Sequence, residues 1–500
     1  MDKATTTGQM GRERMMSQYL TALTQGNIDT VIEVLAKAEQ DPQLEEMLWS
    51  LHQKNMLADL GAVPQMPSET RQREGSRTNS AEPGHNTALR VKRHVRKPRR
   101  VSSFLQTLVA VLTVTMIVGG FVTLFAARRS STLGNGIPSN WCQPSVPGLN
   151  NSSSLDAVAA ISSSNVWAVG HGGDSSGNKN RTLIEHWDGH IWRIVASPNL
   201  GTGDNFLSAV VALSPTNIWA VGQAFSPDQQ YSTEILVEHW DGKQWSIIPT
   251  PNPAKGGVNR FFGISAISAT DIWAVGSMLP STSSLSGKPN ETLIEHWDGR
   301  NWQVVASPNP GNQGGALESV VALSANDIWA VGLAVSGSLP LIEHWDGTSW
   351  KVAATPAVPP TPNGLNAITA VSADDVWAVG GGNANALIEH WNGTSWSAVL
   401  NPGKVNGPSQ NGATLNGVVA LAHDNVWAVG QINGVGQTTE QALRHSSALV
   451  EHWDGQRWQM ISTLKPVAQL SSIAVTSSQQ LWISGGSYTR TGVPYVAYSC

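Results

Sequence analysis

From residue 140 onward, short apolar runs alternate with polar turns, and the pattern recurs about every 50 residues. In one example the run Leu317–Leu323 precedes a polar S-A-N-D turn, and a second run ends in W-A-V-G. A third run ends in E-H-W, and a D-G turn then precedes a last run from Trp350. Short runs bounded by Asn, Asp, Ser and Gly are typical of β-strands joined by tight turns. Each unit therefore predicts four antiparallel strands.

The tryptophan of the W-A-V-G motif marks the successive units and is predicted to be structural in each. These residues are Trp167, Trp219, Trp273, Trp329, Trp377 and Trp427, with Trp482 in a degenerate W-I-S-G. Four strands in a unit of about 50 residues are typical of a blade of a β-propeller. The sequence predicts an all-β seven-bladed β-propeller over residues 140–500, with blades starting near residues 155, 207, 262, 317, 365, 415 and 470.

The last unit lacks the fourth strand, and residues 140–147 match its pattern. We expect this segment to complete the last blade, because an open ring would leave two unpaired strand edges. Cys142 lies in the segment and Cys500 lies in the strand that it should pair with. Neighbouring strands bring side chains to about 5 Å, which is within reach of a disulfide. A Cys142–Cys500 disulfide is therefore predicted.

The order W-A-V-G, then E-H-W-D-G-x-x-W, resembles the kelch repeat. A kelch blade has a strand ending in double glycine, an aromatic-Asp hairpin and a later tryptophan. Here only Gly380-Gly381 and Gly485-Gly486 give the double glycine, and tryptophan stands where kelch has tyrosine. The resemblance covers residues 140–500 and implies the same propeller fold.

The region before the repeats predicts a different architecture. Residues 1–60 have helical spacing at Met15, Tyr19 and Leu23 and predict a small α-helical module. Residues 61–103 are rich in Pro, Ser, Gln and Arg and have no apolar periodicity. Such a composition cannot bury enough apolar surface to fold, so a disordered basic linker is expected.

Residues 104–127 contain no charged side chain and, at about 1.5 Å per residue, are long enough to cross a bilayer as one helix. Ten Lys and Arg residues lie between Arg71 and Arg100, whereas only Arg128 and Arg129 follow before Lys179. The positive-inside rule then places the N-terminus in the cytoplasm and the propeller outside, after a tether at residues 128–139. We expect a single-pass cell-membrane protein.

This layout resembles anti-sigma-factor-like single-pass membrane regulators. The resemblance implies that residues 1–60 bind a cytoplasmic protein partner. The zinc-binding His/Cys pattern of many such modules is absent from this sequence.

Charge and chemical motifs limit the functions to be considered. Residues 130–500 contain 14 Lys and Arg against 24 Asp and Glu, so no nucleic-acid partner is expected. Glu-His pairs recur in six units, and adjacent residues on a strand point to opposite faces, so we interpret the histidines as structural. No G-x-S-x-G or H-E-x-x-H motif occurs, and no catalytic residue, metal site or cofactor is predicted.

Function is expected where the units differ. The connections between strands two and three lie at the same end as those between strands four and one, and both vary in length. The candidate ligand-binding residues there are Tyr231, Arg260, Phe261, Lys288 and Arg444. The leading hypothesis is a module that binds a protein or glycan, with a sensor or regulator role through the cytoplasmic partner. The alternatives are an extracytoplasmic glycan hydrolase or lyase, and a surface display or adhesion protein.

Overall fold

A computed structural model divides the chain into two compact units, Met1–Thr132 and Leu133–Cys500. It describes residues 12, 14–19, 21, 34 and 140–500, apart from 150–152, 175, 177–178, 228–231, 281–289, 310–313, 335–338, 357–362, 383–385, 401–409, 435–445, 465–468 and 487–493.

The described residues of the first unit are helical, and Tyr19 and Val34 among them are buried. No helix within the described residues is long and apolar enough to cross a membrane. The linker at 61–103, the apolar segment at 104–127 and the tether at 128–139 lie outside the described residues.

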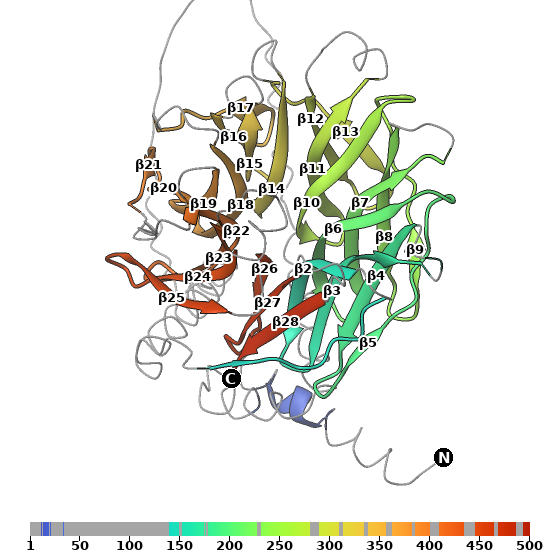
Figure 1. Ribbon diagram of the computed structural model, residues 1–500, viewed down its shortest axis with the longest axis horizontal. Coiled ribbons are helices and arrows are strands. Elements are labelled where there is room, and N and C mark those ends of the chain that lie inside the picture. The colour runs from blue at the N-terminus through green and yellow to red at the C-terminus, as the bar shows by residue number, and fades with distance from the viewer. Residues whose placement is uncertain are drawn as a thin grey trace, which may run out of the picture. The chain divides into compact units, whose positions relative to one another are not determined.

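The second unit consists of β-strands (Figure 1). They are β1 (Trp141–Cys142), β2 (Ser153–Ser162), β3 (Asn165–Gly173), β4 (Asn180–Trp187), β5 (Trp192–Ile194), β6 (Asn205–Ser214), β7 (Asn217–Phe225), β8 (Thr233–Trp240), β9 (Trp245–Ile247), β10 (Val258–Ser268), β11 (Asp271–Leu279), β12 (Glu291–Trp297), β13 (Trp302–Val305), β14 (Gly315–Ser324), β15 (Asp327–Ala334), β16 (Leu339–Trp345), β17 (Trp350–Val352), β18 (Asn363–Ser372), β19 (Asp375–Gly382), β20 (Ala386–Trp391), β21 (Trp396–Ala398), β22 (Gln410–Ala422), β23 (Asn425–Gly434), β24 (Ser447–Trp453), β25 (Trp458–Leu464), β26 (Gln469–Val475), β27 (Leu481–Gly486) and β28 (Pro494–Ser499).

Consecutive strands pair antiparallel in chain order to form repeated four-stranded units, of which β14-β15-β16-β17 is an example. The first hairpin of that unit closes between Ser324 and Asp327. The last hairpin turns at Asp346, whose Oδ1 accepts the backbone N–H of Thr348 (2.9 Å) and of Ser349 (3.0 Å). Gly347 within this turn has φ 89°, a conformation that favours glycine. The D-G turn therefore has the role expected from the sequence.

The units form an all-β, propeller-like arrangement. The first strands of successive units (β2, β6, β10, β14, β18, β22 and β26) are neighbours, and β26 and β27 contact β2 again. Figure 1 shows these strands in the middle, with β5, β17, β21 and β25 towards the periphery. Side-chain hydroxyls form hydrogen bonds between some neighbouring first strands; for example, the Ala322 N–H of β14 donates to Ser265 Oγ of β10 (3.1 Å).

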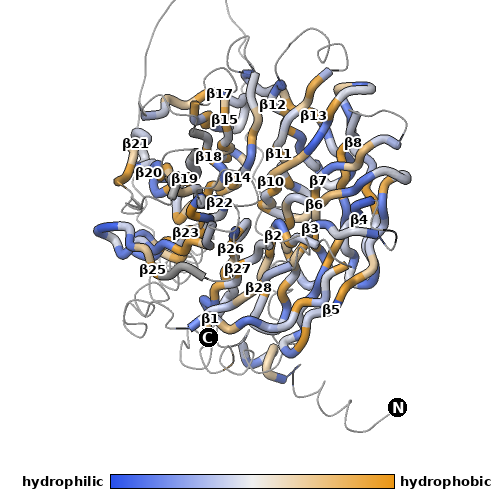
Figure 2. The backbone as a smooth tube through the Cα atoms, in the orientation of Figure 1, coloured by the Kyte–Doolittle hydropathy of each residue, from blue (hydrophilic) through white to orange (hydrophobic). Residues whose placement is uncertain are grey.

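The apolar core lies between successive units. In one cluster Trp329, Val331 and Ile342 of one unit pack against Leu365 and Trp396 of the next. Figure 2 shows the contrast between apolar strands and hydrophilic connections, such as the tip of the β24–β25 hairpin. Each unit therefore depends on both of its neighbours for burial, as expected for a repeat architecture.

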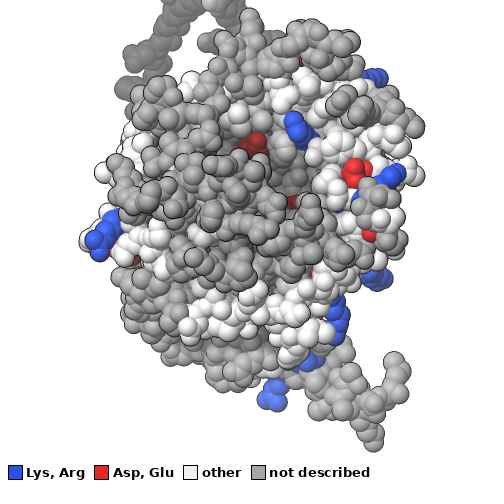
Figure 3. Space-filling model, viewed as in Figure 1, with Lys and Arg blue, Asp and Glu red and all other residues white. Residues whose placement is uncertain are grey.

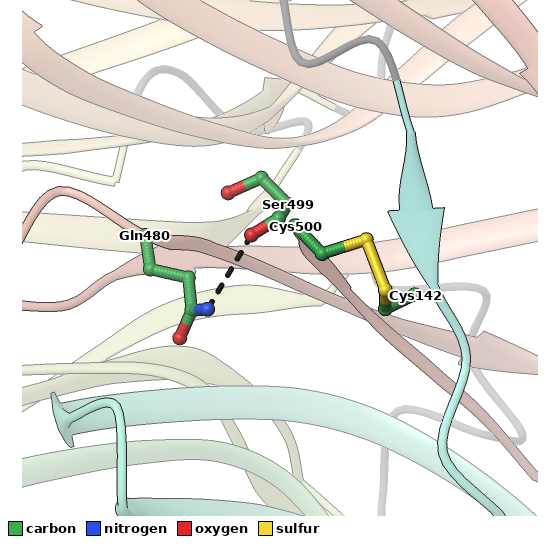
Figure 4. The surroundings of a disulfide bond; sticks show 4 residues. All are labelled: Cys142, Gln480, Ser499 and Cys500. Carbon is green, nitrogen blue, oxygen red and sulfur yellow. Dashed lines mark hydrogen bonds between the residues drawn. A yellow bond between two sulfur atoms is a disulfide. The ribbon is translucent and has the colours of Figure 1, made fainter.

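The strand β1 completes the last sheet, in the order β1-β28-β27-β26. Trp141 pairs with Ser499, and Cys142 forms the predicted disulfide with Cys500, with a Cα–Cα distance of 5.7 Å. Figure 4 shows this bond beside the hydrogen bond from Gln480 Nε2 to the Ser499 carbonyl (3.3 Å). The prediction of a closing strand and a disulfide is confirmed.

The first strands begin one to five residues before the positions expected from the sequence, and one of them differs from the expected register. In the third unit Phe261 pairs with Gly276, as Leu155 pairs with Gly170 in the first unit. Phe261 rather than Phe262 is thus the core residue, and it is 0% exposed. The prediction of Phe261 as a ligand-binding residue is wrong, because a one-residue change of register exchanges the two faces of a strand.

Candidate functional site

Every first strand has a β-bulge at the same position. In β2 the pairing steps from Leu155–Gly170 to Ala157–Val169, which leaves Asp156 without a partner on β3. The equivalent residues are Ser208, Phe262, Glu318, Asn366, Asn416 and Ser471. We call Asp156 and these residues the bulge ring, and all of them are half-buried. Bulges re-aim a side chain and are over-represented beside active sites.

The glycine of W-A-V-G explains why the bulge recurs. A Cβ on Gly332 would lie 1.9 Å from the Ala316 carbonyl oxygen, and one on Gly170 would lie 2.1 Å from that of Ser154. Only glycine allows the first strand to approach this closely. The motif therefore encodes the bulge as well as the second strand.

The bulge ring lies at the end of the sheets where the units differ. Each bulge residue is near the start of its first strand, away from the tight turn that joins the first two strands. This is the end from which the variable connections leave. On the face in Figure 3, the charged side chains of the described residues are scattered singly and form no extended patch of one sign.

The structure places the candidate residue Arg260 beside the bulge ring. Its Nε donates to Ser277 Oγ (3.1 Å), and its guanidinium carbon lies 5.3 Å from the centre of the Phe262 ring. Burial lowers the pKa of Arg260, while the nearby carboxylate of Glu318 opposes that shift. Burial likewise raises the pKa of Glu318, and Arg260 opposes this shift. The two side chains therefore share one partly dehydrated environment.

A second polar group lies on the first unit. Asp156 Oδ1 accepts the Ser154 hydroxyl (2.6 Å), and Asp156 Oδ2 lies 3.1 Å from His171 Nδ1. The His171 ring is in edge contact with Phe206 of the next unit, with centroids 4.7 Å apart. An acid, an imidazole and an aromatic ring thus meet where these two units adjoin.

Elsewhere in the ring, amide side chains reach across to the following unit. Asn366 Nδ2 donates to the Leu415 carbonyl (2.9 Å), and Asn416 Nδ2 donates to the Leu470 carbonyl (2.9 Å). Asn366 Nδ2 also lies 3.4 Å from Asn416 Oδ1. These bonds orient the amides, while the Asn366 carbonyl oxygen has no protein partner within the described residues.

The remaining sequence candidates are not brought together. Tyr231, Lys288 and Arg444 lie outside the described residues. The sequence interpretation missed Asp156, His171, Glu318 and the asparagines of the ring. One signal could have found most of them, because the residue after the repeated first-strand leucine is polar and differs between units.

The repeated Trp and His residues form a packing motif. Trp329 stacks on His344 with centroids 4.0 Å apart, and His344 Nε2 lies 2.8 Å from Asp327 Oδ1. Equivalent stacks join Trp167 to His186 and Trp377 to His390. The structural tryptophans Trp167, Trp219, Trp273, Trp329, Trp377, Trp427 and Trp482 are all buried.

The Glu of each E-H-W motif is fully buried against the preceding unit. The Ser307 hydroxyl donates to Glu343 Oε2 (2.9 Å), and the Gly148 N–H donates to Glu185 Oε1 (2.9 Å). Burial raises the pKa of Glu185, Glu295, Glu343 and Glu389 to about 7. These carboxyls lie between units, and the described part of the chain contains no group of His, Cys, Asp and Glu that could hold a metal ion.

Neither a protein-family model nor a curated protein sequence matches the chain. The structure is similar to that of YCF48 bound to D1 peptide (18% identity, 74% of this chain and 99% of that one, TM-score 0.45). It is also similar to the six-bladed fucose-recognising lectin of Aleuria aurantia (15% identity, 63% of this chain and 97% of that one, TM-score 0.38). A third similar structure is a PL25 ulvan lyase bound to a GlcA-Rha3S saccharide (9% identity, 71% of this chain and 95% of that one, TM-score 0.43).

Proposed function

We propose that this protein is a binding module, a seven-bladed propeller whose glycan or protein ligand occupies the bulge ring. One observation carries the proposal. Five residue types (Asp, Ser, Phe, Glu and Asn) occupy the seven bulge positions, while an apolar residue before each one and a glycine opposite it repeat.

The physical argument starts from what a repeated residue does. A side chain present in every unit is explained by packing between units, which every unit needs. The glycine opposite the bulge explains why the bulge recurs, but the half-buried side chains at the bulge vary, so no contact shared by every unit explains their identity. Accessible polar side chains held on a rigid scaffold are well suited to hold a ligand.

We also propose that residues 104–127 anchor the protein in a membrane, with residues 1–60 inside and the propeller outside. The uncharged segment and the basic residues before it support this arrangement, and a disulfide fits an oxidising compartment. Protease treatment of intact cells should digest the propeller and spare the N-terminal module. Protection of the propeller would contradict the orientation.

The layout further supports a cytoplasmic protein partner for residues 1–60, as in the membrane regulators that it resembles. Affinity purification of the full chain should recover a partner that is lost when residues 1–60 are deleted. Recovery of the same proteins with both chains would contradict this role.

The central test is a binding screen with the full-length chain in detergent against arrays of glycans, cell-wall fragments and peptides, scored for binding and for turnover. The variants are Asn366→Ala with Asn416→Ala, and Phe262→Ala. The control is Gln244→Ala, which alters an exposed hairpin turn at the opposite end of the sheets. Binding should weaken in the ring variants and persist in the control. Equal binding by all of them would overturn the site, and turnover of a bound glycan would favour the hydrolase or lyase alternative.

A further inference from the structure

Arg260 is fixed in orientation but keeps two donor groups free. Its Nε donates to the buried hydroxyl of Ser277, and its guanidinium carbon lies 5.3 Å from the centre of the Phe262 ring. Within the described residues, the terminal Nη1 and Nη2 groups have no hydrogen-bond or ion-pair partner. A guanidinium held by its Nε beside an aromatic ring presents these two amino groups as a preoriented fork.

Glu318 lies beside Arg260 without forming an ion pair with it. The two first strands approach closely here, since a Cβ on Gly263 would lie 2.9 Å from the Cα of Ser319. Arg260 and Glu318 interact electrostatically, yet the described residues contain no salt bridge or hydrogen bond between them. A half-buried cation that its nearest acid does not contact is available to an external anion.

The geometry of the free groups selects the kind of anion. Two parallel N–H groups on one edge of a guanidinium match the two oxygens of a carboxylate. A phosphate monoester carries up to two charges and would meet more repulsion from Glu318 in this partly dehydrated position. A group with one negative charge is therefore the better match to the single cation.

The rest of the ring favours a saccharide as the carrier of that carboxylate. Ser208 and Ser471 have hydroxyls without a hydrogen bond in the described residues, and Asn366 has an unpartnered carbonyl oxygen. Such groups accept from and donate to sugar hydroxyls. A peptide bound by strand addition needs a regular row of backbone groups and side-chain pockets, and the bulge interrupts that row.

We infer that Arg260 binds the carboxylate of an acidic saccharide, a hexuronate unit within an oligosaccharide, while the Ser and Asn side chains of the ring bind its hydroxyls. This inference rests on the proposed binding function of the bulge ring. It assigns Arg260 the recognition of charge and Glu318 the exclusion of more highly charged groups.

The test is isothermal titration of the full-length chain with a hexuronate oligosaccharide and with the same oligosaccharide after reduction of its carboxyls to alcohols. Loss of a charge-assisted hydrogen-bond pair should weaken binding about 10- to 100-fold. We expect that loss on carboxyl reduction and in Arg260→Gln, and a smaller one in Arg260→Lys. Glu318→Gln should tighten binding of the hexuronate, an effect that a merely structural role would not produce.

Lys255→Gln is the matched control, because it removes the same charge from an exposed position in the connection just before β10. Equal losses in Lys255→Gln and Arg260→Gln would overturn the inference, as would equal binding of the acidic and reduced oligosaccharides. If the protein bound an acidic peptide and no saccharide, and the ring variants lost that binding, the inference would be overturned and the proposed function would stand. A ligand that binds undiminished to every ring variant would overturn both. Unfolding midpoints of each variant show whether a loss reflects misfolding.

Discussion

In the third and fourth units, the outer hairpin and the inner bulge use polar residues in opposite ways. In the hairpin, His344 is stacked on Trp329 and pairs with Asp327, and Glu343 accepts the hydroxyl of Ser307. At the bulge, Glu318 has no hydrogen-bond partner within the described residues, and the fork of Arg260 is likewise free. The same repeat thus contains one polar layer directed at protein and another that is available to a ligand.

The difference shows how a site can be recognised in a repeat protein. The Trp and His residues dominate the sequence, but their contacts are internal to the blades and to the junctions between them. The bulge residues form no conspicuous motif in the sequence, yet their identities vary and their side chains are only half-buried. Substitutions in the two regions should therefore separate stability from binding.

The largest effect is expected in the repeated layer. Trp329→Ala removes a ring that is 3% exposed and packs within 5.0 Å of Trp391. We expect a loss of about 3 to 5 kcal/mol in the free energy of unfolding, because a large buried side chain leaves a cavity. Urea unfolding followed by tryptophan fluorescence measures it. Val352→Ala, at a position 47% exposed, is the control and should change the value by less than about 0.5 kcal/mol.

The second-largest loss of stability is expected on removal of the disulfide. Cys142 and Cys500 are 358 residues apart, and a bond closing so long a loop restricts the unfolded chain. Replacing both by Ser should lower stability by about 2 to 5 kcal/mol. Thermal unfolding with and without reductant measures the loss. Reductant should destabilise the native protein and leave the double variant unaffected, and an unchanged midpoint in both would contradict a stabilising closure.

The buried glutamates should give a smaller effect that depends on pH. Burial raises the pKa of Glu389 to about 7, above the value of about 4.3 for an unfolded glutamate. The folded state therefore binds this proton more tightly, so the stability contributed by Glu389 is full below about pH 4 and is lost as the pH rises through 7. Glu389→Gln, which imitates the protonated form, should stabilise the protein by about 1 to 3 kcal/mol at pH 8.

Urea midpoints at pH 5 and pH 8 measure this dependence. The control is Glu234→Gln, because Glu234 is exposed on β8, the strand of the second unit that is equivalent to β20. An equal gain in stability in the two variants at pH 8 would contradict the burial of a charge between units. A gain in Glu389→Gln that is larger at pH 5 than at pH 8 would contradict it as well.

The smallest effect on stability is expected at the bulge ring. Asn416→Ala removes the hydrogen bond to the Leu470 carbonyl and should lower the free energy of unfolding by about 0.5 to 1.5 kcal/mol. Urea unfolding beside Trp329→Ala compares the two layers directly. A loss as large as that of Trp329→Ala would show that the bulge ring is a packing layer like the Trp and His residues.

The sequence determined the repeated four-strand unit, the closing strand and the disulfide, because each depends on local patterns or on a simple count. Alternating runs and D-G turns specify strands and hairpins within a few residues. Residues 140–147 complete the last unit by the same pattern, and the two cysteines then have one possible intramolecular pairing.

The position of the candidate site depends on contacts between strands and between units. The bulge arises because Gly332 permits a close approach by the Ala316 carbonyl, a contact between strands that no single run reveals. That contact and its equivalents set the register, which buries Phe261 and leaves Phe262 in the ring. Arg260 and Glu318 belong to different units, and they become neighbours only when the first strands pack together.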